Sequence, residues 1–219
     1  PGRHGQGHAQ FEGPLLPIGQ ILGRRVAMGG QSDAVQDFFA ASDRRSLEQD
    51  QLLMDALMER AETVPNGNST LVSSDDLQER SPFERGYRRA RRYREQLGIE
   101  TTVEPTHFET IEDSVGLTLR AAAERPNGRY ARIIGSTHQR ASMDRFVKAC
   151  AIYHLLSTVQ EGEMRLVTSA KTSDQAAARA FAAELLAPSA NLRRELSANP
   201  DPQEIDALAQ KYQVSSQVL

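Results

Sequence analysis

Several features that mark particular classes of protein are scarce or missing in this chain of 219 residues. It contains a single cysteine, Cys150, so no disulfide can form within the chain, and this favours a reducing, cytoplasmic location. No apolar run approaches the length of a membrane span. The sequence therefore argues against a disulfide-rich secreted domain and against a membrane-spanning protein.

An excess of charge of one sign is also missing. The 26 Lys and Arg residues nearly balance the 29 Asp and Glu residues, for a net charge of −3. This balance argues against a strongly basic nucleic-acid-binding protein, while a local basic patch stays compatible with it. An initial methionine is missing as well, and the last residues resemble an interrupted helix, so we expect a fragment of a longer protein.

What the chain does contain is a high share of alanine and other helix-favouring residues. Apolar spacing and capping residues predict helices over residues 32–41, 46–62, 81–96, 107–115, 143–158, 173–186, 189–197 and 202–212. Short apolar segments bounded by turn residues predict strands over residues 117–124, 131–136 and 163–169. The sequence thus predicts an α+β fold, mainly helical, with a small three-stranded sheet.

A linker is predicted at residues 64–74, where Pro65-Asn66-Gly67-Asn68-Ser69 interrupts the helical pattern. We therefore expect an N-terminal arm and helical region at residues 1–80 and a second domain at residues 81–219. His4 and His8 are four residues apart in the arm, but the glycines around them favour a flexible segment over a metal site.

The helix predicted at residues 81–96 is rich in arginine, with the densest group formed by Arg88, Arg89, Arg91 and Arg92. Such a group can bind nucleic acid or an acidic protein through its charge. A solvated helix face, on which the arginine stems cover apolar neighbours, explains the same pattern. The sequence leaves both interpretations open.

The most specific pattern is Arg145-Phe-Val-Lys-Ala-Cys-Ala-Ile-Tyr-His154. It has the frame Arg-Phe-x-x-Ala-His-Glu-x-x-His of a zinc-peptidase helix, in which the two His bind the metal and the Glu acts as base. Cys150 replaces the first His, Ala151 replaces the Glu, and only His154 remains. A thiolate and an imidazole can both bind zinc, but an alanine cannot act as a base. Taken alone, a lone Cys and a lone His on an apolar helix are more often packed core residues than metal ligands.

Residues 176–188, Ala-Ala-Ala-Arg-Ala-Phe-Ala-Ala-Glu-Leu-Leu-Ala-Pro, closely resemble the second signature of the ImmA/IrrE family of metallopeptidases. That signature reads roughly Glu-x-x-Ala-Asn-x-Phe-Ala-x-x-Leu-Leu-Met-Pro. Residues 82–90 are similar to the family's entry helix, and residues 205–215 to the segment after the signature. With residues 145–154 they follow the family's order across residues 81–219. The resemblance implies zincin-like helices packed with the small sheet.

By this resemblance, Cys150 and His154 occupy the positions of two metal-binding His residues, and Gln175 that of a third ligand, a Glu. Zinc is the cofactor that these positions imply, but with one ligand substituted, one weakened and the base lost, we expect no bound cofactor and no catalysis. The resemblance then implies a regulatory or interaction protein in stress response, phage defence or transcription control. Its partner would be a protein, for example a helix-turn-helix regulator.

Two alternatives stay open. In the first, the chain is an active peptidase in which Cys150 and His154 hold zinc with Asp174, or in which Cys150 is a nucleophile assisted by His154. In the second, the chain is a regulator that binds nucleic acid through Arg88, Arg89, Arg91 and Arg92. Binding of that kind weakens steeply with salt.

Overall fold

The computed structural model describes residues 32–42, 45–62, 81–98, 108–111, 118–124, 132–136, 140–157 and 164–219. Within them, the helices are α2 (Ser32–Ala41), α3 (Leu47–Glu62), α4 (Pro82–Leu97), α5 (Ala141–Ser157), α6 (Ser173–Leu186), α7 (Ser189–Glu195) and α8 (Pro202–Tyr212). The strands are β1 (Phe108–Ile111), β2 (Leu119–Glu124), β3 (Arg132–Ser136) and β4 (Met164–Thr168). The predicted fold class, α+β and mainly helical, is confirmed.

The strands form one sheet in the order β1-β3-β2-β4. The three predicted strands are β2, β3 and β4, and they pair antiparallel, with Ala122 opposite Ile134 on one side and Leu166 on the other. The prediction was wrong at β1, because a helix was expected over residues 107–115 and Phe108–Ile111 instead pairs parallel with β3. Its short sequence Phe-Glu-Thr-Ile joins an aromatic residue to β-branched ones, which suit a pleated strand. The sheet therefore has four strands in the described residues rather than three.

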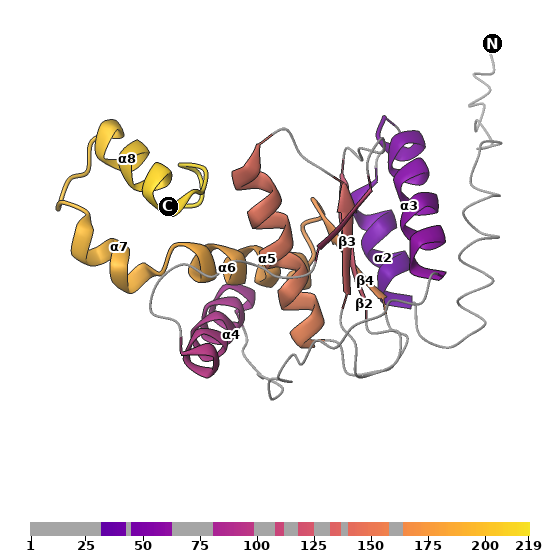
Figure 1. Ribbon diagram of the computed structural model, residues 1–219, viewed down its shortest axis with the longest axis horizontal. Helices are drawn as coiled ribbons and strands as arrows, with labels where there is room; N and C mark the ends of the chain where they lie inside the picture. The colour runs from indigo at the N-terminus through magenta and orange to yellow at the C-terminus, as the bar shows by residue number, and fades with distance from the viewer. Residues whose placement is uncertain are drawn as a thin grey trace, which may run out of the picture.

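Helices cover both faces of the sheet, with α2 and α3 on one face and α5 on the other (Figure 1). Successive residues of a strand point to opposite faces, and β2 follows this rule. Ala122 belongs to the hydrophobic cluster of α2 and α3, whereas Ala121 and Ala123 belong to the cluster of α5 and α6. The predicted linker at residues 64–74 lies outside the described residues, so the domain division stays a prediction. The helices on its N-terminal side nevertheless share a core with the strands on its C-terminal side.

Helix α4 packs closely against α6, and Gly86 makes this approach feasible. A Cβ atom at Gly86 would lie 2.3 Å from the carbonyl oxygen of Ala177 and 2.7 Å from the backbone nitrogen of Phe181. The helix begins at Pro82 and ends at Gly98, whose φ of 64° lies in the left-handed region. The contact sets the arginines of α4 against α5 and α6.

Helix α5 runs through the core, and every residue from Ala149 to Leu156 is buried. It packs on α6 as well as on β2 and β4, so the pattern that contains Cys150 and His154 lies at the centre of the larger hydrophobic cluster. None of the helices in the described segments combines the length and the apolar character needed to cross a membrane.

Candidate functional site

The structure gathers the three predicted ligand positions at the junction of α5, β4 and α6. All three side chains are buried: Cys150 is 3% exposed, His154 0% and Gln175 1%. Cys150 and Gln175 line the same groove, and the Gln175 side chain lies beside the imidazole of His154. The i,i+4 spacing on α5 and the resemblance on α6 therefore indicated positions that do come together in space.

The side chain of Gln175 is bonded to the backbone of β4, which lies at one edge of the sheet formed by the described strands. Its amide nitrogen donates to the carbonyl oxygen of Leu166 over 2.6 Å, and its amide oxygen accepts from the N–H of Thr168 over 3.0 Å. A neighbouring strand would use the same two groups, so the amide occupies the place of a peptide unit along this edge. The Gln175 side chain thereby covers part of the edge of β4, and both its amide oxygen and its amide nitrogen are held by hydrogen bonds.

Burial keeps both residues of the α5 pair uncharged. It raises the pKa of the Cys150 thiol to about 12. Burial, and then the positive charge of Arg165, lower the pKa of His154 to about 3. A thiolate is the form of cysteine that attacks a substrate or binds a metal, and a thiolate–imidazolium pair would place two charges in the core. These environments oppose the predicted nucleophilic role of Cys150.

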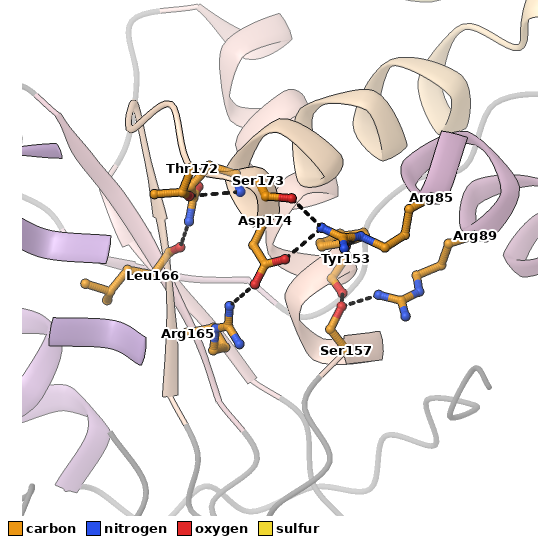
Figure 2. Close-up of polar contacts among 10 residues, drawn as sticks. Arg85, Arg89, Tyr153, Ser157, Arg165, Leu166, Thr172, Ser173 and Asp174 are labelled. Carbon is orange, nitrogen blue, oxygen red and sulfur yellow. Dashed lines mark hydrogen bonds and ion pairs between the residues drawn. The ribbon is translucent and has the colours of Figure 1, made fainter. Parts of the chain in front are cut away.

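Ala151 is fully buried, so the position implied for the catalytic base contributes only a methyl group to the core. The carboxylate nearest in sequence to the third position belongs to Asp174. One of its oxygens accepts from Arg85 over 2.8 Å and the other from Arg165 over 2.7 Å (Figure 2). Burial alone would raise the pKa of Asp174, but the hydrogen bond and charge of Arg165, together with the charge of Arg85, lower it. Such a carboxylate is a weak base.

The residues at these positions do not fit a zinc centre. Zinc sites in proteins draw three or four ligands from His, Cys, Asp and Glu. Across the part of the chain that the structure describes, no group of three or more such side chains is placed to hold a metal ion. Asp174, the third ligand of the zinc alternative, is instead bonded to two arginines.

The predicted arginine patch on α4 is divided between the interior and the surface. Arg89 is buried, donates to the hydroxyl of Ser157 and lies with its guanidinium carbon 4.8 Å from the centre of the Tyr153 ring (Figure 2). Arg91 forms an ion pair with Glu184 over 3.0 Å. Both interpretations of this group placed all four arginines at the surface, but Arg89 lies in the interior.

Arg88, Arg91 and Arg92 are exposed, so the nucleic-acid alternative stays a prediction that rests on them. Arg85 and Arg94, which flank the group on the same helix, also donate to the chain itself. Arg85 donates to the Tyr153 hydroxyl over 3.1 Å, and Arg94 to the carbonyl oxygen of Leu185 over 2.9 Å. Helix α4 therefore uses much of its charge to hold α5 and α6.

A groove of about 380 Å³ beside Cys150 was not predicted from the sequence. Its apolar side includes Met143, Phe146 and Val147 of α5, and its cationic residues are Arg120, Lys171 and Arg179. No local pattern could have indicated it, because the three cations come from β2, the segment after β4, and α6.

No model of a known protein family matches the chain, and no curated protein matches it either. The likeness to the ImmA/IrrE metallopeptidases therefore rests on residues 82–90, 145–154, 176–188 and 205–215 alone, and it stays a resemblance.

Proposed function

We propose that this chain is a catalytically degenerate, metallopeptidase-like protein that regulates or binds another protein. The observation that carries the proposal is the state of the three gathered ligand positions. The Gln175 amide is bonded to β4 at both ends, and the thiol of Cys150 and the imidazole of His154 are buried without charge. The junction is built as a packed core.

The intact packing around these positions supports a retained scaffold over a damaged enzyme. Phe181 and Leu185 of the second signature are fully buried, and α5 is surrounded by the sheet and α6. A scaffold of this kind keeps its surface available for a partner even when the chemistry is lost. The resemblance suggests a cytoplasmic role in stress response, phage defence or transcription control, with a helix-turn-helix regulator as the partner.

Metal content tests the proposal directly. The full chain is loaded with zinc in reducing buffer, dialysed, and analysed by inductively coupled plasma mass spectrometry. Cys150→Ala and His154→Ala variants serve as controls. We expect well under one zinc per chain in all three proteins, because among the residues that the structure describes no third ligand is placed beside the α5 pair.

Stoichiometric zinc in the native chain that disappears in both variants would overturn the proposal, because it would show a working centre at these positions. Cleavage of a casein or peptide-library substrate that depends on Cys150 would overturn it by the other route. Equal, substoichiometric zinc with no cleavage would support it.

A further inference from the structure

The groove beside Cys150 has the composition of a binding site rather than of a packing defect. Its apolar wall contains Phe146, which is partly buried, and Met143, which is 43% exposed and stands at the rim. A volume of about 380 Å³ lies within the range of about 300–1,000 Å³ typical of ligand sites. The groove can therefore receive one or two side chains of a ligand.

The charged residues known to line the groove are all cationic. Arg120, Lys171 and Arg179 line it, and no acidic residue is among its lining residues in the described part of the chain. Arg179 is half-buried, and its guanidinium donates to the carbonyl oxygen of Ala170 over 3.0 Å. Lys171 is exposed beside it. Cations that share a confined, partly apolar space attract a negatively charged group.

The edge of β4 next to the groove is not free to pair with the backbone of a ligand. A peptide could extend the sheet by pairing with β4, but the Gln175 amide already bonds to Leu166 and Thr168. A ligand of the groove is therefore held by its side chains and charge more than by its backbone.

The net charge of the chain favours a carboxylate of a protein over a nucleic acid as the ligand of this groove. The chain carries a net charge of −3, and a nucleic acid gains affinity from many phosphate contacts along a basic surface. One compact groove with three cations suits a single carboxylate better. An apolar neighbour of that carboxylate would cover Phe146 and Val147.

We propose that this groove binds an extended, acidic segment of a partner protein, with an Asp or Glu side chain against Lys171 and Arg179 and an apolar side chain against Phe146. The inference rests on the proposed function, since it identifies the chemistry of the partner segment. In this inference, the junction binds its partner by recognising a carboxylate and needs no metal ion.

Fluorescence anisotropy with labelled hexapeptide pools tests the inference. The pools carry Asp, Asn or Lys at two fixed positions and mixed apolar residues elsewhere. We expect the full chain to prefer the Asp pool over the Asn and Lys pools by about tenfold, with weaker binding as salt rises.

Three variants locate the site. Lys171→Glu and Met143→Glu each place a negative charge in the groove, and each should weaken binding of the Asp pool about tenfold. Arg193→Glu, on the exposed side of α7, changes the net charge as much as Lys171→Glu and should leave binding unchanged. Circular dichroism melting curves check that all variants fold.

An Asp pool that binds no better than the Asn pool, or that binds Lys171→Glu as well as the native chain, would overturn the inference. So would inorganic phosphate, citrate or a short single-stranded DNA that competes better than the Asp pool, because the ligand would then not be a protein segment. Zinc-dependent cleavage of the Asp pool would overturn the proposed function while leaving the groove assignment intact. Failure of the preference without zinc or cleavage would overturn only the groove assignment.

Discussion

Replacing Gln175 by Glu tests the structural role of this residue most sharply, because Glu is the residue that the metallopeptidase resemblance expects there. The change keeps the size of the side chain and replaces the amide NH₂ by an oxygen. In the folded chain that oxygen would face the carbonyl oxygen of Leu166, at a position where the nitrogen now donates over 2.6 Å. The side chain is only 1% exposed, so water cannot separate the two oxygens.

The magnitude follows from the groups involved. The variant loses one buried hydrogen bond, leaves the Leu166 carbonyl without its donor and buries a carboxylate, for a combined loss of about 2–4 kcal/mol in the free energy of unfolding. Protonation of the new carboxyl would restore a donor, so burial raises its folded pKa above the unfolded value of about 4.3. The loss should therefore be small at acidic pH and should grow as the pH rises through the folded pKa.

Urea denaturation of the native chain and of Gln175→Glu between pH 5 and pH 8 measures this difference. Gln210→Glu, an exposed change of the same chemistry on α8, serves as the control and should alter stability by less than about 0.5 kcal/mol. A Gln175→Glu variant that is as stable as the native chain at pH 8, or that binds one zinc without loss of stability, would refute the reasoning. It would show that Gln175 does not secure the edge of β4.

Three further predictions follow from the described contacts. Gly86→Ala should lower the free energy of unfolding by about 1–3 kcal/mol, since its Cβ would lie 2.3 Å from the Ala177 oxygen; thermal melts measure the loss, and an unchanged melting temperature would contradict the close packing of α4 on α6. The Cys150 thiol, whose pKa is raised by burial to about 12, should react with Ellman's reagent at pH 8 only after denaturant is added; rapid reaction of the folded chain would contradict its burial. Burial and Arg165 lower the pKa of His154 in the folded chain to about 3, below the unfolded value of about 6.5, so the unfolded chain takes up the proton first. The free energy of unfolding should therefore fall as the pH drops from about 6.5 toward 3, by up to about 1.4 kcal/mol per pH unit. NMR of the imidazole should show no titration between pH 5 and pH 8, and a shift in that range would contradict the prediction.

Much of the fold could be predicted because its elements are marked by local chemistry. Pro82 and Gly98 delimit α4, and Asp201 and Pro202 begin α8 as capping and first-turn residues should. The strand at Phe108–Ile111 was predicted as a helix because local chemistry does not mark it as a strand. Four residues are too few to separate helical from strand periodicity, and pairing with β3, more than 20 residues away, decides the outcome.

In the candidate site, too, features set by local sequence could be predicted, whereas features set by tertiary packing could not. The shared face of Cys150 and His154 follows from helix geometry and could be predicted from their spacing. The bond between Gln175 and β4 could not, because it depends on which strand lies at the sheet edge. The direction of Arg89 was equally hidden, since it depends on how α4 crosses the end of α5.

The four residues at the junction are consistent with one another in charge. Burial holds the Cys150 thiol and the His154 imidazole neutral, Ala151 contributes a methyl group, and Gln175 an amide, so four adjacent buried positions carry no net charge. A zinc centre would instead place a divalent cation there and need anionic ligands to balance it. Metal binding at this junction would therefore need anionic ligands at more than one of these positions, whereas the neutral core with its cationic groove alongside agrees with the proposed role as a binding protein.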